Sequence, residues 1–168
     1  MGYRPFAQEI SFGATRGMTI IELLLVVTII GILAATAGSA FDGYRKRAMT
    51  QEPLRLLPMM AGGIVTYYGR EDEFIPLGPT NVPPTNGSTA RSVDFLENPE
   101  WNWIRINFSI SDPIRYGYQG SQTGPGSYLL EALGDLNSNG ILSIFSISIF
   151  TTGERTQISP VHIFNELE

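Results

Sequence analysis

Cysteine is absent from this chain of 168 residues, and histidine occurs once, at His162. Without thiols there are no disulfides, no thiol catalysis and no thiolate metal sites. A single imidazole disfavours histidine-based triads and zinc clusters. The acidic residues also form no spaced pair in a recognisable catalytic motif. We therefore predict that the protein is not an enzyme.

Positive charge is also scarce, with 11 Lys and Arg against 16 Asp and Glu and a formal net charge of -5. Binding to nucleic acid usually requires a basic face that displaces counterions from the phosphates. The sequence gives no support to a nucleic-acid partner.

Charge is missing altogether between Leu23 and Phe41, and the stretch from Met18 to Phe41 is interrupted only by Glu22. At about 1.5 Å per residue, a helix over this stretch reaches roughly 36 Å, enough to cross a hydrocarbon core of about 30 Å. Two alternatives stay open: a buried helix of a soluble protein, and a signal peptide cleaved after residues 35–37. The first seldom runs apolar on every face for this length in so small a chain. The second expects a shorter apolar core and a basic start.

Glu22 is the unexpected residue in this run, because an ionised carboxylate is costly in a bilayer and implies a partner. No basic side chain follows it within four helical turns. Proteolysis before Met18 would create a new α-amino group, and the amine of a neighbouring copy could then pair with Glu22. The alternative is that Glu22 reaches the headgroups near the end of the span.

The residues Arg16-Gly17 followed by Met18-Thr19-Ile20-Ile21-Glu22-Leu23-Leu24-Leu25-Val26-Val27 resemble the processing motif of type IV pilins and of the related pseudopilins of type II secretion. The resemblance implies that a prepilin peptidase cuts between Gly17 and Met18 and methylates the amine of Met18. Glu22 is then the fifth residue of the mature chain and contacts the terminal amine of a neighbouring subunit. Met18 stands where many pilins have Phe.

The resemblance also divides the chain into a leader (1–17), a long N-terminal helix (18–70) and a globular head (71–168). Residues 18–41 of the helix would span the membrane and later form the filament core. Pro53 and Pro58 each remove a backbone donor, so we expect either a kinked helix or two consecutive helices after the span.

Runs typical of β-strands follow in the head. Ile104, Ile106 and Phe108 alternate along one run, and Phe145, Ile147 and Ile149 along the last. We expect these two faces and Leu130 to be buried against the helix. The predicted fold class is α+β, with the long helix packed against a C-terminal antiparallel sheet as in pilins. The expected strands are 103–109, 114–119, 128–133 and 141–151.

Three consecutive basic residues, Arg45, Lys46 and Arg47, follow the apolar run, whereas only Arg4 and Arg16 precede it. The positive-inside rule therefore does not favour a cytoplasmic N-terminus, and that orientation is taken from the resemblance. The cluster either meets lipid headgroups before assembly or forms a solvated face.

Asp135, Asn137 and Asn139 precede Gly140 in the D-x-N-x-N-G order that opens a calcium loop. The twelfth position, where an EF-hand has a bidentate Glu, is Ser146. The same Asn-Gly pair is typical of a tight turn between antiparallel strands. A simple turn and a calcium site both stay open, and no other cofactor is expected.

The leading hypothesis is a structural subunit, a major or minor pilin of a type IV pilus. Its expected partners are other pilins in a helical filament, the prepilin peptidase and, before assembly, inner-membrane lipid. The precursor would cross the inner membrane once with its head in the periplasm, and the mature subunit would reach the cell surface. One alternative is a pseudopilin of a type II secretion system. Another is a single-span periplasmic binding protein or enzyme.

Overall fold

The computed structural model describes residues 17–80, 89–95, 102–153 and 155–167. The chain divides into two compact units, Met1–Phe41 and Asp42–Glu168. Of the predicted leader only Gly17 lies within the described residues. The first unit contains most of helix α1, and the second contains its last turns and every other described element. From here on, the head means this second unit, which begins earlier than the head predicted for 71–168.

The helical part consists of two consecutive helices, α1 (Ile20–Met49) and α2 (Gln51–Glu71). They separate at Thr50, whose hydroxyl donates to Arg47 O at 2.9 Å. Pro53 lies in the first turn of α2, where its missing N–H leaves no bond unmade. Pro58 lies inside α2 without ending it.

Helix α2 is amphipathic, with one buried stripe at spacings of three and four residues. It ends at Asp72, which has a left-handed backbone (φ 56°) and donates its N–H to Tyr68 O. Leu54 is half-buried at the edge of this stripe. The buried residues of α2 are Pro53, Leu56, Leu57, Met60, Ala61, Ile64 and Tyr67.

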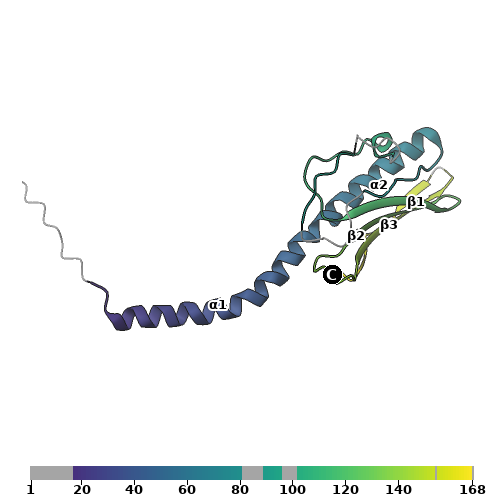
Figure 1. Cartoon of the computed structure of the whole chain (residues 1–168). Coiled ribbons are helices and arrows are strands. Elements are labelled where there is room, and N and C mark those ends of the chain that lie inside the picture. Colours follow the sequence, from purple (N-terminus) through teal and green to yellow (C-terminus); the bar gives the residue numbers. More distant parts are fainter. Residues whose placement is uncertain (1–16, 81–88, 96–101, 154, 168) are drawn as a thin grey trace, which may run out of the picture. The chain divides into compact units, whose positions relative to one another are not determined.

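A five-stranded antiparallel sheet forms the other layer of the head, and α2 packs on one face of it (Figure 1). The order is β1-β2-β3-β4, and β5 pairs with the other end of β3 on the same edge as β4. This arrangement confirms the predicted α+β fold class. The strands are β1 (Gly117–Gly124), β2 (Ser127–Gly134), β3 (Ser143–Thr152), β4 (Arg155–Ile158) and β5 (His162–Phe164).

Alternation along β2 and β3 decides which side chains face α2. Leu130 is directly opposite Ile147 in the register, and both are buried. Phe145 and Ile149 share that face and are fully buried. The face predicted for this strand is therefore confirmed.

The strand predicted for residues 103–109 is wrong, because this segment forms a 3₁₀ helix, η3 (Trp103–Ile106). Left-handed residues lie at both ends, Asn102 with φ 58° and Asn107 with φ 53°. The turn leaves Ile104 54% exposed while Ile106 is buried, so the apolar alternation does not define one face here.

Aromatic packing holds this turn in place. The rings of Trp103 and Phe108 lie 5.6 and 5.3 Å from the ring of Phe95, each edge to face.

Two of the other predicted strands match β2 and β3 within about two residues. The strand predicted for 114–119 begins later, at Gly117, because Ile114 pairs with Arg91 in an isolated bridge instead. Strands β4 and β5 were not predicted.

Candidate assembly site

Thr19 and Glu22 form a reciprocal cap at the start of α1. The backbone N–H and the hydroxyl of Thr19 each donate to Glu22 Oε2 at 2.9 Å. In return, the backbone N–H of Glu22 donates to Thr19 Oγ1 at 3.3 Å. This is the capping box, in which a Thr and a Glu three residues later satisfy donors that the first helical turn leaves unpaired. The signal Thr19-Ile20-Ile21-Glu22 is in the sequence, but we had not used it.

The cap occupies one oxygen of Glu22 and leaves the other without a hydrogen bond among the described residues. The carboxylate is exposed at the start of the apolar helix. A second donor from outside the chain can therefore reach Oε1 without displacing Thr19.

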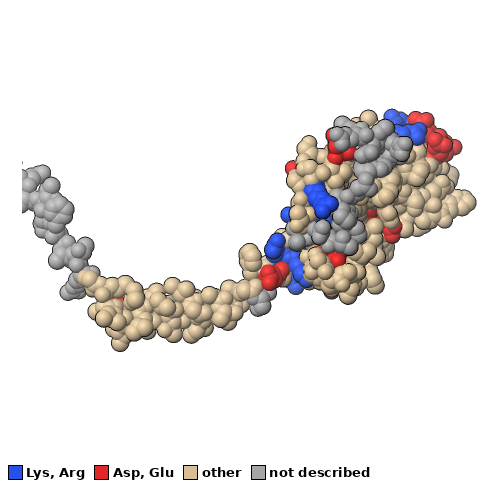
Figure 2. Space-filling view, viewed as in Figure 1, with Lys and Arg blue, Asp and Glu red and all other residues tan. Residues whose placement is uncertain are grey.

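The apolar part of α1 is exposed on every side. Ile20–Gly38 is long and apolar enough to cross a membrane and has no buried residue within the structure. Exposure ranges from 41% at Val26 to 80% at Ile20 among its large apolar side chains. In Figure 2 this stretch carries almost no charged surface. Such a helix requires a bilayer or other apolar helices around it.

The polar side chains inside this stretch are satisfied within the helix. Thr28 donates its hydroxyl to Leu24 O at 2.7 Å, and Thr36 donates to Leu33 O at 3.0 Å. No threonine hydroxyl between residues 20 and 38 is left needing water, which suits a helix that enters an apolar environment.

Gly17 and Met18 precede the helix in a segment without regular secondary structure, and both are exposed. A β-carbon at Gly17 would meet nothing within 4 Å. A peptidase requires an exposed, non-helical segment, so the predicted cleavage position is accessible. Cleavage itself remains a prediction.

The loop of Asp135, Asn137 and Asn139 is a closed turn. Buried Asp135 accepts the backbone N–H groups of Asn139 at 3.2 Å and of Gly140 at 2.8 Å. Asn137 Oδ1 accepts the N–H of Asn139 at 2.9 Å, and Asn139 Oδ1 accepts that of Ile141 at 2.7 Å. Within the described part of the chain, no group of three or more His, Cys, Asp or Glu side chains is placed to hold a metal.

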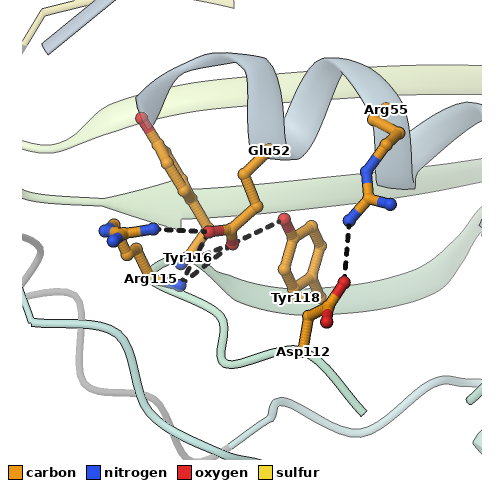
Figure 3. A network of polar contacts seen from close by, with 6 residues as sticks. All are labelled: Glu52, Arg55, Asp112, Arg115, Tyr116 and Tyr118. Carbon is orange, nitrogen blue, oxygen red and sulfur yellow. Dashed lines mark hydrogen bonds and ion pairs between the residues drawn. The ribbon is translucent and has the colours of Figure 1, made fainter. Parts of the chain in front are cut away.

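A second carboxylate, Glu52 in the first turn of α2, fastens this helix to the sheet (Figure 3). It accepts the backbone N–H groups of Arg115 at 2.9 Å and Tyr116 at 3.1 Å, and the hydroxyl of Tyr118 at 3.0 Å. The Arg115 guanidinium lies 3.9 Å away, and the Glu52 side chain is only 11% exposed.

Burial raises the pKa of the Glu52 carboxyl, and the hydrogen bonds from Tyr116, Arg115 and Tyr118 oppose that rise. Burial also raises the pKa of Tyr116 to about 12. Sequence reasoning missed this network, because nothing local links Glu52 to residues more than sixty positions later.

The basic cluster Arg45, Lys46 and Arg47 lies in the last turns of α1, and Lys and Arg side chains gather there in Figure 2. A cavity of about 260 Å³ opens beside it. Lys46 Nζ donates to Leu167 O at 3.0 Å, which ties the C-terminal segment to this end of the head. The cavity is lined by Asp42, Arg45, Lys46, Met49 and Leu136.

Curated proteins with significant similarity to this chain are fimbrial proteins and major pilins. A fimbrial protein of Neisseria meningitidis is 35% identical over 80 residues, which cover 48% of this chain and 44% of that protein. The type IV major pilin protein PilE1 of Neisseria gonorrhoeae is 40% identical over 53 residues, 32% of each chain. The fimbrial protein EcpC of Eikenella corrodens is 42% identical over 53 residues, 32% of this chain and 35% of that protein.

These similarities support assignment of the chain to the type IV pilin family. The α+β fold agrees with it. The chain spans less than half the length of the curated relatives it matches. No family model matches this chain. No solved structure matches it either.

Proposed function

We propose that this chain is a structural subunit of a type IV pilus and polymerises through its apolar N-terminal helix. The observation that carries the proposal is the exposed helix Ile20–Gly38, whose one ionised side chain is held at its start in a capping box. The similarity to fimbrial proteins and major pilins supports the same conclusion.

Processing is the first step of the proposed pathway. A prepilin peptidase removes residues 1–17 and methylates the new amine on Met18. Methylation keeps this amine cationic. The cap at Thr19 survives the cut, because the N–H of Thr19 remains an amide in the mature chain.

Assembly is the second step. The single-span subunit waits in the inner membrane with its head in the periplasm, and its Glu22 then pairs with the Met18 amine of a neighbouring copy. The pairing brings opposite charges together in an apolar surrounding, where their attraction is strongest and an unpaired charge is most costly. Association of apolar helices alone gives no fixed register, whereas this ion pair selects one.

The experiment uses a bacterium that lacks its own major pilin and retains its pilus machinery. Glu22→Gln removes the charge at constant size, Glu22→Asp keeps it, and Glu71→Gln is a matched control on the exposed end of α2. We expect all variants to be processed and membrane-inserted. Only Glu22→Gln should lose surface filaments, by at least tenfold in the sheared fraction. Normal filaments from Glu22→Gln would contradict the proposed pairing.

A pseudopilin of a type II secretion system is the second candidate, because its N-terminal motif is of the same kind. The relatives are fimbrial proteins and major pilins, and this similarity favours the pilus. Deletion of the native gene separates the two. Loss of surface filaments with normal protein export supports the pilin, and loss of export without loss of filaments supports the pseudopilin.

A further inference from the structure

The basic cluster Arg45, Lys46 and Arg47 has no role in the proposed pathway so far. Its position is unfavourable for insertion, because positive charge normally stays on the cytoplasmic side and the proposed topology sends these residues across. Three such residues in succession on the translocated side therefore need a compensating interaction.

The cavity beside the cluster has both polar and apolar walls. Arg45, Lys46 and Asp42 form its polar wall, and Met49 and Leu136 form its apolar wall, of which Leu136 is buried. Its volume of about 260 Å³ is sufficient for a small polar headgroup. Among the described residues, Lys46 uses one of its three N–H donors, on Leu167 O.

The segment that carries the cluster is basic, although the whole chain is acidic. From residue 42 to 47 there are three cations and one carboxylate, a sum of +2, against -5 for the full chain. Glu166 and Glu168 flank Leu167 in the sequence, and counting both lowers the sum at this end of the head to 0. The cluster is the most concentrated positive charge in the sequence.

The short stretch of chain between the membrane-crossing segment and the basic cluster indicates which anion is available to the cavity. Arg45 follows Gly38, the last residue of the membrane-crossing segment, by seven residues, or about 10 Å along a helix. Headgroup layers occupy the 5–8 Å or so on each side of the hydrocarbon core. Phe41 and Tyr44, 68% and 69% exposed, lie between the two, as interfacial aromatic residues do. The tether therefore holds the cavity permanently near lipid phosphates, at a high effective concentration.

We propose that this cavity, with Arg45 and Lys46, binds the phosphodiester of an anionic phospholipid from the leaflet that faces the head. The lipid neutralises the cluster while the subunit waits in the membrane. The proposal rests on the proposed function in that the helix Ile20–Gly38 spans a bilayer with the basic cluster on the translocated side; it does not require polymerisation.

The test uses the mature full-length chain in bilayer nanodiscs of phosphatidylcholine with one tenth phosphatidylglycerol. After mild detergent transfer, native mass spectrometry counts the lipids that stay bound. We expect phosphatidylglycerol to be enriched at least threefold over its share of the bilayer. Arg45→Gln with Lys46→Gln should abolish the enrichment, whereas Arg91→Gln with Arg155→Gln, which removes the same charge from exposed sites elsewhere on the head, should leave it.

A variant that is expected to bind more lipid is needed as well, because loss of enrichment alone could reflect a folding defect. Asp42→Asn removes the carboxylate from the cavity wall and should increase the enrichment. Raised salt should reduce it in the wild-type chain. Equal retention of both lipids by the wild type, or equal loss in both double variants, would overturn the proposal.

The competing partner is an acidic side chain of a second copy. Lys46 is the single lysine of the chain, so among the carbodiimide cross-links in filaments, those that mass spectrometry maps to a lysine side chain report on this position alone. A cross-link from Lys46 to a neighbouring carboxylate, without lipid enrichment in nanodiscs, would replace the lipid by the second copy. Enrichment in a chain that never forms filaments would leave the lipid site intact and contradict the proposed function.

Discussion

Thr19 holds Glu22 Oε2 with two donors, its backbone N–H and its hydroxyl, both at 2.9 Å. Glu22 is therefore both part of the helix cap and the residue that we propose for assembly. The carboxylate that we assign to intersubunit pairing is already oriented in the single subunit, so less conformational entropy is lost when the neighbouring amine binds.

Substitutions at Thr19 test this orientation. Thr19→Ser keeps the hydroxyl donor and should assemble normally. Thr19→Val keeps the shape but loses the hydroxyl donor, and we expect its filament yield to fall severalfold with unchanged processing. Quantifying the sheared surface fraction against total membrane-bound subunit provides the measurement. Equal yields from the two variants would show that the hydroxyl does not orient Glu22.

The titration of Glu52 should be visible in how the stability of the head depends on pH. Burial raises the pKa of this carboxyl above its ordinary value of 4.5, so the folded state keeps the proton to a higher pH than the unfolded state. The contribution of Glu52 to stability is therefore largest at low pH and falls as pH rises through the raised pKa. Glu52→Gln has no such titration.

We therefore expect the stability difference between wild type and Glu52→Gln to shrink as the pH rises above 4.5, the ordinary pKa of this carboxyl. Denaturation of the full chain in detergent at several pH values measures it, with exposed Glu71→Gln as the control. A difference that widens with pH would mean that Arg115 and the backbone donors outweigh burial.

Gly62 and Gly63 are adjacent in α2 and offer a matched pair. A β-carbon at Gly62 would meet nothing within 4 Å, so Gly62→Ala should stabilise the helix by about 0.5–1 kcal/mol. At Gly63 it would lie 2.6 Å from the backbone O of Ile106, and Gly63→Ala should destabilise the head by about 1–3 kcal/mol. Thermal unfolding of both variants is the measurement. Equal effects would contradict the close approach of α2 and η3.

Calcium titration distinguishes the two interpretations of the Asp135 loop, a simple turn and a calcium site. Its side-chain oxygens already accept backbone N–H groups, so we expect millimolar calcium to leave the melting temperature unchanged. Asp135→Ala should cost about 1–3 kcal/mol, because the Gly140 N–H loses its acceptor and the Asn139 N–H keeps only Asn137 Oδ1. A calcium-dependent rise in melting temperature that disappears in Asp135→Asn would instead establish the metal site.

Sequence patterns predicted the parts of this protein that depend on local periodicity. The exposed apolar helix and the alternating Phe145, Ile147 and Ile149 follow from spacing alone. Alternation failed at Ile104, because left-handed Asn102 and Asn107 turn the chain back and the aromatic cluster of Phe95 fixes it there.

Long-range contacts were beyond sequence reasoning. Glu52 meets Tyr118 across 66 positions, and Lys46 meets Leu167 across 121. Neither contact leaves a local pattern, because a single charged residue in a helix is usually solvated. The Thr19–Glu22 cap differs, because a Thr followed three residues later by a Glu is a local pattern that indicates a capping box.

Mass spectrometry of the subunit recovered from sheared surface filaments tests the central claim most directly. The account predicts an N-terminal peptide that begins at Met18 and carries one methyl group on its α-amine. A chain that retains residues 1–17, or that is absent from the sheared fraction while abundant in the membrane, would contradict it.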